Sequence, residues 1–329
     1  MRHSGETKKA TAAIFLPFTE DRRITSLRAP KPSVDPWVAH GSTIDDERRP
    51  GGTVERALTV FLAGAECPFT CSFCDLWRWT IDGPTPPGAL PAQLKQTLDN
   101  LDTLDTLQRL KLYNASNFFD RRAVPAEDWP ALADLTRPFG AVTVESHASM
   151  IGPPALELAR LIPGRLEVAV GLETIHPAAA AHLNKRMDVA QFDRAAGFLA
   201  EHAIDLRVFV LLGAPYVAPE ETVEWTIRTA EHAARCGAAA IALIPVRGGN
   251  GELERLAALG AFMPPTLPQL EAALDGCIGL GPAAVAADLW DVDRLDACAE
   301  CRSRRVERLR RMNLTGRGEP PVTCPECGS

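Results

Sequence analysis

Long hydrophobic runs are missing from the sequence. No segment approaches the ~20 apolar residues that a helix needs to cross a bilayer. The first 18 residues lack the apolar core and the small-residue cleavage site of a secretory signal. An excess of basic charge is missing as well, since the net charge is −7, so the chain as a whole gives no reason to expect a nucleic-acid binder. We therefore expect a cytoplasmic protein without a membrane partner.

Cysteine, in contrast, is abundant, and its placement is uneven. Three of the nine cysteines lie within eight residues, at Cys67, Cys71 and Cys74. Four others form two C-x-x-C pairs near the end, while Cys236 and Cys277 stand alone. An odd total in tight local clusters argues against a secreted disulfide framework. In a reducing compartment the same spacings indicate metal binding.

The order of apolar runs along the chain predicts its organisation. Residues 1–54 are rich in proline, glycine and charge, and they predict an N-terminal extension that wraps the domain and contains one short helix. Beyond it, short apolar runs alternate with longer amphipathic segments. Six runs are rich in β-branched residues, as strands buried on both faces should be. They are 58–63, 110–113, 141–145, 166–171, 206–212 and 239–245.

Six strand–helix units in series predict a parallel sheet with right-handed crossovers. A complete barrel needs eight units over about 250 residues, whereas only residues 55–250 carry the alternating pattern. We therefore expect an α/β fold with a partial (β/α)6 TIM-like barrel over residues 55–250, and a doubly wound open sheet is the alternative. Residues 251–285 predict a helical connection, and residues 286–329 predict a small C-terminal module with four cysteines.

The loop with three cysteines directly follows the first predicted strand, so it lies at the strand end where such folds bind ligands. Thiolates in a C-x3-C-x2-C pattern can ligate three irons of a cubane cluster and leave the fourth iron open to an exogenous ligand. A zinc knuckle and incidental buried cysteines are the alternatives. Structural zinc usually takes four protein ligands, so the loop predicts a 4Fe-4S cluster on Cys67, Cys71 and Cys74.

The spacing of this loop resembles the defining motif of the radical S-adenosylmethionine (SAM) superfamily, as do its position and the aromatic Phe73 before the last cysteine. The resemblance implies an enzyme whose open iron binds the amino and carboxylate groups of SAM. An electron from the cluster, supplied by a reductant such as flavodoxin or ferredoxin, cleaves SAM in that family. The resulting 5′-deoxyadenosyl radical abstracts hydrogen from the substrate.

Polar or small residues close most of the other predicted strands, although a buried strand should not end in polar groups that have nothing to contact. The resemblance implies that these positions bind SAM together with the loop aromatic. The predicted contacts are Phe73, Asn114, Ala115, Ser116, Glu145, Glu173 and Gly213. Glu173, or Glu145 as the alternative, would accept hydrogen bonds from the ribose or the ammonium group. The usual Gly-Gly-Glu of the superfamily is absent, and Asn114-Ala115-Ser116 stands in its place.

Two longer segments narrow the resemblance. Lys111–Asp120 (KLYNASNFFD) and Gly171–Glu221, which contains GLET and LNK, resemble the group of the archaeosine synthase radical SAM subunit and, more distantly, the Elongator catalytic subunit. Members of this group act on tRNA, so the resemblance implies a modified tRNA nucleoside as substrate. A radical SAM enzyme acting on a small molecule, lipid or peptide is the alternative. A non-catalytic zinc-ribbon binding protein is the third hypothesis.

The tail holds the two remaining cysteine pairs, Cys298 with Cys301 and Cys324 with Cys327. Four thiolates in this array suit tetrahedral zinc, and Gly328 suits the turn of a zinc-ribbon knuckle. An auxiliary iron–sulfur cluster is the alternative, whereas a disulfide pair fits a cytoplasmic protein poorly. We expect zinc.

Between the two pairs, six arginines lie within Arg302–Arg311. In an otherwise acidic chain they predict a phosphate-binding surface that delivers tRNA to the mouth of the barrel. Two alternatives remain open. One is a solvated helix that packs through Val306, Leu309 and Met312, and the other is a docking surface for an acidic protein partner.

Overall fold

One eight-stranded sheet forms the centre of the protein, in a computed structural model that describes residues 17–328. The strands pair in chain order; β2 to β8 are parallel, and β1 is antiparallel to β2. They are β1 (Gly41–Arg48), β2 (Val54–Phe61), β3 (Arg109–Tyr113), β4 (Ala141–Glu145), β5 (Arg165–Glu173), β6 (Asp205–Leu212), β7 (Ala240–Pro245) and β8 (Ala284–Ala287).

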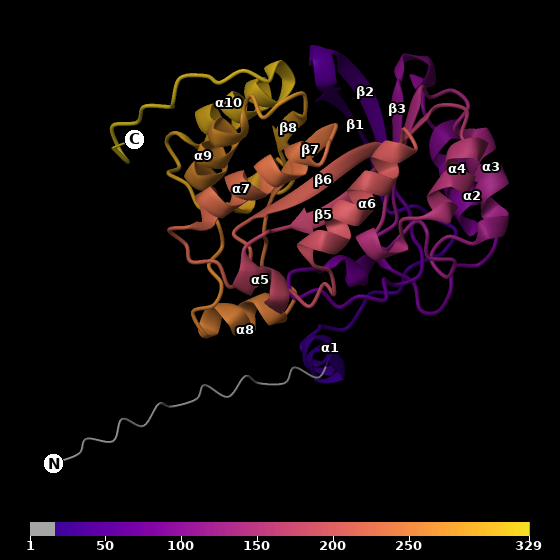
Figure 1. The fold of residues 1–329 in the computed structure, drawn as a ribbon, viewed down its shortest axis with the longest axis horizontal. Helices are drawn as coiled ribbons and strands as arrows, with labels where there is room; N and C mark the ends of the chain where they lie inside the picture. The colour runs from indigo at the N-terminus through magenta and orange to yellow at the C-terminus, as the bar shows by residue number, and fades with distance from the viewer. Residues whose placement is uncertain (1–16, 329) are drawn as a thin grey trace.

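Ten α-helices of the described residues accompany this sheet. They are α1 (Pro17–Ser26), α2 (Ala89–Asp99), α3 (Trp129–Leu135), α4 (Pro153–Leu161), α5 (Pro177–His182), α6 (Val189–Glu201), α7 (Thr222–Arg235), α8 (Glu252–Ala258), α9 (Leu267–Cys277) and α10 (Arg302–Thr315). Of these, α1, α5 and α8 lie at one end of the molecule (Figure 1). Figure 1 shows α2, α3 and α4 packed together on one side, with α9 and α10 beside β8 at the other. Local capping explains several helix starts; Asp188, for example, accepts a hydrogen bond of 2.6 Å from the backbone nitrogen of Gln191.

The strand order confirms a nearly closed barrel and not a doubly wound sheet. A doubly wound sheet reverses its strand order at a switch point, whereas this sheet runs without reversal from β1 to β8. All six predicted strands are present, and the sheet has one more strand at each edge. β1 comes from the predicted extension, and its charged sequence GSTIDDER lacks the apolar pattern of a buried strand. β8 is apolar and mostly buried, but its four residues make too short a run to stand out in the sequence.

The predicted short helix of the extension corresponds to α1. Residues 1–16 of that extension lie outside the described residues. Among the residues that the structure describes, no helix has both the length and the apolar character needed to cross a membrane.

The C-terminal helix α10 covers the gap between the edge strands β1 and β8, both of which it contacts. The side-chain amide of Asn313 donates to the carbonyl oxygen of Ala287 at 2.9 Å, and its oxygen accepts from the Ala287 nitrogen at 2.8 Å. Asn313 therefore supplies the pairing that a further strand would give to β8. At the β1 edge, Gly316, which directly follows α10, lies close to Arg48 at the end of β1. Any side chain at position 316 would overlap the guanidinium group of Arg48.

A charged network fills the barrel interior near the amino ends of the strands. Glu167 is fully buried and pairs with Arg49, Arg109 and Arg207. Burial alone would raise the pKa of Glu167, but these arginines hold it well below its usual range. The amino end of a barrel usually serves stability, while the carboxyl end carries the chemistry. The interior charges therefore belong to the scaffold.

Candidate active site

The loop Cys67–Cys74 begins six residues after β2 ends at Phe61, at the carboxyl end of the barrel. Segments from two distant strand ends hold it in place. The side chain of Asn250, which follows β7, donates to the Ser72 carbonyl oxygen at 2.8 Å. The side chain of Asn184, in the segment after α5, donates to the Thr70 carbonyl oxygen at 2.9 Å. The loop is therefore fixed by the barrel even though it has no regular secondary structure of its own.

The segment that contains α1 crosses the outside of this loop. Asp21 accepts hydrogen bonds from Thr70 and from Asn184, and it pairs with Arg186. Further along, Arg28 pairs with Glu66 at 2.6 Å, directly before the first cysteine. Figure 1 shows α1 at the same end of the molecule as α5 and α8. The sequence predicted a wrapping extension, but it did not reveal that this extension braces the cysteine loop.

Burial controls the ionisation of the three thiols. It raises the pKa of Cys71 to about 12 although Lys185 nearby lowers it, and it raises the pKa of Cys74 well above the usual range. The pKa of Cys67 is also raised by burial, which outweighs a hydrogen bond of 3.3 Å from the Asn117 side-chain nitrogen to its sulfur. Thiols of this kind lose their protons when a metal supplies the compensating positive charge.

Beside the loop, the end of β3 carries buried polar atoms that have no partner. Asn114 is fully buried, and neither its side-chain nitrogen nor its side-chain oxygen makes a hydrogen bond within the described residues. The buried hydroxyl of Ser116 is unpartnered as well. Unsatisfied buried polar groups of this kind are uncommon, and a bound molecule is one way to satisfy them. A ligand with ammonium, carboxylate and hydroxyl groups, such as SAM, has the chemistry to satisfy them.

Glu145, at the end of β4, contacts the turn that follows β3. Its carboxylate accepts a hydrogen bond of 2.8 Å from the Asn114 backbone nitrogen. Burial raises the pKa of Glu145 to about 7, although the backbone nitrogens of Asn114, Ala115 and Ser116 act to lower it. Ala115 has a left-handed backbone with φ of 54°. The structure thus brings four of the predicted contacts together, with Glu145 supporting the turn that the other three form.

Glu173, at the end of β5, forms a buried ion pair with Lys185. Gly171 makes room for this pair, because a Cβ there would overlap the Glu173 carboxylate and lie 2.5 Å from Nζ of Lys185. Glu173 itself has a left-handed backbone with φ of 66°. Sequence reasoning singled out Glu173 but missed Lys185, whose positive charge acts on Cys67 and Cys71. The LNK motif (Leu183–Lys185) could have indicated Lys185, since it places this lysine next to Asn184, which binds the cysteine loop.

Phe73 and Gly213 lie in apolar surroundings. Phe73 packs against a small core that includes Leu211, Val246 and Phe262. Gly213 has φ of 77°, and a Cβ there would lie 2.8 Å from the ring of Pro265. These contacts explain both residues through packing, and their predicted role in SAM binding stays a prediction.

His147 packs face to face on Phe69 of the cysteine loop, with ring centroids 4.0 Å apart. Its Nε2 lies 3.0 Å from the Lys185 carbonyl oxygen, which makes it a donor there. Burial, together with the positive charge of Lys185, lowers the pKa of His147 to about 4. A neutral imidazole in this position supports the loop.

A cavity of about 330 Å³ opens beside the first cysteine. Its walls come from the cysteine loop, from the segment after it and from Arg122, which follows β3. The lining residues are Glu66, Cys67, Pro68, Thr70, Ile81, Asp82, Gly83 and Arg122. Cys67 therefore borders a space large enough for part of a ligand of nucleoside size.

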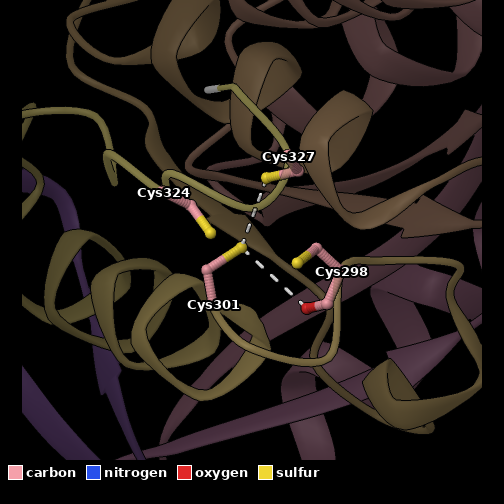
Figure 2. Close-up of side chains that lie close together, drawn as sticks. All are labelled: Cys298, Cys301, Cys324 and Cys327. Atoms are coloured by element: carbon pink, nitrogen blue, oxygen red, sulfur yellow. Dashed lines mark hydrogen bonds between the residues drawn. The ribbon is translucent and has the colours of Figure 1, made fainter.

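The four tail cysteines form a second centre, and Figure 2 shows their sulfur atoms converging on one point. All four sulfurs lie within 4.8 Å of one another, and those of Cys301 and Cys327 are 3.8 Å apart. Four sulfurs at about 2.3 Å from one tetrahedral zinc would be about 3.8 Å apart. Arg305, one turn into α10, donates to the Cys301 sulfur at 3.2 Å. The predicted grouping is present, with an arginine that can offset thiolate charge.

The arginines of α10 do not form one exposed surface. Arg305 and Arg308 are buried, and both pair with Glu271 of α9. Arg304, Arg310 and Arg311 are exposed, although Arg311 pairs with Glu319 at 2.7 Å. Two of the six arginines predicted to bind phosphate therefore fix α10 to the body of the protein.

No family model matches the chain, and the comparison with curated proteins gave no match. Solved structures do match. A radical SAM methyltransferase from Sphaerobacter thermophilus has 18% identity and a TM-score of 0.52, over 80% of each chain. Methylornithine synthase (PylB) has 12% identity and a TM-score of 0.48, over 76% of this chain and 80% of its own.

The archaeal Elp3 of Methanocaldococcus infernus, with its N-terminus deleted, has 11% identity and a TM-score of 0.49. The match covers 68% of this chain and 59% of the Elp3 chain. The resemblance to the archaeosine synthase and Elongator group stays a prediction. The Sphaerobacter match, together with the barrel, confirms the expected fold: the chain shares the barrel fold of that methyltransferase.

Proposed function

We propose that this protein is a radical SAM enzyme that binds a 4Fe-4S cluster through Cys67, Cys71 and Cys74. The main support is the position of the three thiols, which lie in a braced loop at the carboxyl end of the first parallel strand of a radical SAM fold. Three thiolates match three irons of the cluster and leave the fourth for SAM. When bound, the cluster and SAM supply the 5′-deoxyadenosyl radical, after one electron from a reductant such as flavodoxin or ferredoxin.

The chain's own residues would orient and enclose these groups. The unpartnered amide of Asn114 and hydroxyl of Ser116 would bind polar atoms of SAM, since they are buried without hydrogen bonds beside the loop. The side chain of Asn117 would hold the Cys67 sulfur by its hydrogen bond. Lys185, already neutralised in part by Glu173, would offset the negative charge of the thiolates.

Iron analysis after anaerobic reconstitution tests the cluster. We expect four irons per chain in addition to any metal in the tail, and we expect loss of those four irons in Cys71→Ala. Cys277→Ala is the matched control, since Cys277 is buried in α9 and away from the loop motif. Equal iron in wild type and Cys71→Ala would contradict the assignment.

We propose zinc for the tail centre, on the basis of the four converging sulfurs. An auxiliary iron–sulfur cluster remains the competing assignment, and elemental analysis separates the two. We expect the tail centre to hold one zinc per chain, which is lost in Cys301→Ser and retained in Cys71→Ala. Iron in place of zinc in Cys71→Ala would favour the auxiliary cluster.

We propose a tRNA nucleoside as the substrate, with a small molecule, lipid or peptide as the second candidate. Because Arg305 and Arg308 are buried with Glu271, phosphate binding would depend on the exposed Arg304, Arg310 and Arg311. Replacing these three with alanine should weaken tRNA binding and reduce its salt dependence. Unchanged tRNA affinity in the triple variant would argue against this surface and leave a small substrate or an acidic protein partner. A cytoplasmic location stays part of the same prediction.

A further inference from the structure

A third group of potential metal ligands lies on the outer helices, separate from the cysteine loop and the tail. Asp193 belongs to α6, His232 to α7, and Cys236 follows directly after α7. One ligand atom from each of the three lies within 4.8 Å of the other two. None of these residues has a role in the proposed SAM chemistry.

The fold explains why these three side chains meet. His232 and Cys236 are four residues apart at the end of α7, so they share one face of the helix. The helices α6 and α7 precede and follow the same strand, β6, and α6 presents Asp193 to that face. The carboxylate of Asp193 lies 2.6 Å from Nε2 of His232 and 3.4 Å from Sγ of Cys236. One carboxylate oxygen therefore bridges an imidazole and a thiol.

One of these two distances matches a tetrahedral zinc site, and the other is shorter. Zinc binds sulfur at about 2.3 Å and histidine nitrogen or carboxylate oxygen at about 2.0–2.2 Å. Two ligand atoms of one tetrahedron are then about 3.3–3.6 Å apart. The sulfur–oxygen distance of 3.4 Å already fits. The nitrogen–oxygen distance would have to lengthen by less than about 1 Å, and Asp193 can allow this because its side chain is 45% exposed.

The chemistry of the three donors selects the cation. A thiol and an imidazole are poor ligands for calcium or magnesium, which prefer oxygen. A set of one sulfur, one nitrogen and one oxygen suits zinc, and in zinc sites with three protein ligands water takes the fourth position. Solvent can reach that position because Asp193 is exposed.

We propose that Asp193, His232 and Cys236 form a zinc site that links α6 to α7. The simpler possibility is a hydrogen-bonded triad without metal, with the same contacts. This proposal does not depend on SAM chemistry or on the identity of the metal in the tail, because its test compares zinc content between variants in which both of those centres are intact.

The experiment adds Zn²⁺ alone to the full-length protein with its iron and tail sites filled, followed by desalting and elemental analysis. We expect His232→Ala and Asp193→Asn each to retain one zinc equivalent fewer than wild type. His202→Ala is the matched control, since His202 is an exposed histidine at the end of α6. We also expect added Zn²⁺ to raise the melting temperature of wild type and of His202→Ala, and to leave it unchanged in the two ligand variants.

Co²⁺ provides a second measurement that does not rely on stoichiometry. In wild type we expect absorption from Co²⁺ bound to the Cys236 thiolate, in addition to any absorption from Co²⁺ bound to the tail cysteines. We expect this additional absorption to be lost in Cys236→Ser. The proposal is overturned if wild type and Asp193→Asn, which keeps the shape of the exposed side chain, hold the same amount of zinc. It is also overturned if the extra Co²⁺ absorption persists in Cys236→Ser.

Discussion

The side-chain nitrogen of Asn117 lies 3.3 Å from the sulfur of Cys67 and donates a hydrogen bond to it. The oxygen of the same side chain accepts from the His147 backbone nitrogen at 2.6 Å. Asn117 therefore connects the end of β4 to the first cysteine of the loop and keeps its amide directed at the sulfur. Hydrogen bonds to ligand sulfurs are one of the factors that set the potential of an iron–sulfur cluster.

Replacing Asn117 should change the redox behaviour of the proposed cluster. An N–H donor stabilises the more negative, reduced state, so Asn117→Ala should lower the reduction potential by tens of millivolts, on the order of 1 kcal/mol for one electron. Spectroscopic redox titration measures this shift. Asn100→Ala, at the exposed end of α2, is the control. An unchanged potential in Asn117→Ala would show that the hydrogen bond is absent from the loaded protein.

The ion pair Glu173–Lys185 occupies the space that a side chain at position 171 would take. Alanine at this position would force both side chains to move, because its Cβ would overlap the carboxylate. We expect Gly171→Ala to lower the free energy of unfolding by about 1–3 kcal/mol and to reduce cluster loading. Gly197→Ala is the matched control, since nothing lies within 4 Å of a Cβ at that position in α6. It should stabilise the protein by about 0.5–1 kcal/mol. Equal denaturation midpoints for the two variants would contradict this prediction.

The interior charges should make stability depend on pH. Burial acts to raise the pKa of Glu47, but Arg207 and Lys111 lower it from 4.5 to about 2. Because the folded state holds this carboxyl ionised, its contribution to stability is present above pH 4.5 and is lost as the pH falls towards 2. The contribution is about 3 kcal/mol.

Glu47→Gln should therefore be less stable than wild type at pH 7 and should lose less stability on acidification. Denaturant unfolding at several pH values measures both effects. Glu157→Gln, on the exposed face of α4, is the control and should behave as wild type. An acid dependence of Glu47→Gln that matches wild type would assign the effect to other carboxyls.

Apolar periodicity was sufficient to predict the core of this fold. The six predicted strands are buried on both faces, so their sequences carry the signal directly. β1 was missed because half of its residues are exposed and because Glu47 pairs with Lys111 and Arg207 in a charged interior. Such a strand has a polar sequence although it is part of the sheet.

The candidate site was predictable where the spacing along the chain carries the chemistry. The two cysteine motifs are local in sequence, and the structure brings the tail cysteines together as expected. The brace on the loop depends on contacts such as Asp21 with Asn184, between residues far apart in the chain, for which one sequence gives no signal. Arg305 and Arg308 were interpreted as surface residues because their partner, Glu271, lies on a different helix.

The proposed function requires that the protein cleave SAM reductively. The decisive measurement is the amount of 5′-deoxyadenosine formed after anaerobic reconstitution, addition of SAM and reduction with dithionite. We predict that the wild-type protein forms 5′-deoxyadenosine and that Cys71→Ala, which lacks one thiol of the loop, forms none. Wild-type protein that holds its four irons but yields no 5′-deoxyadenosine would contradict the proposed function, as would equal yields from both proteins.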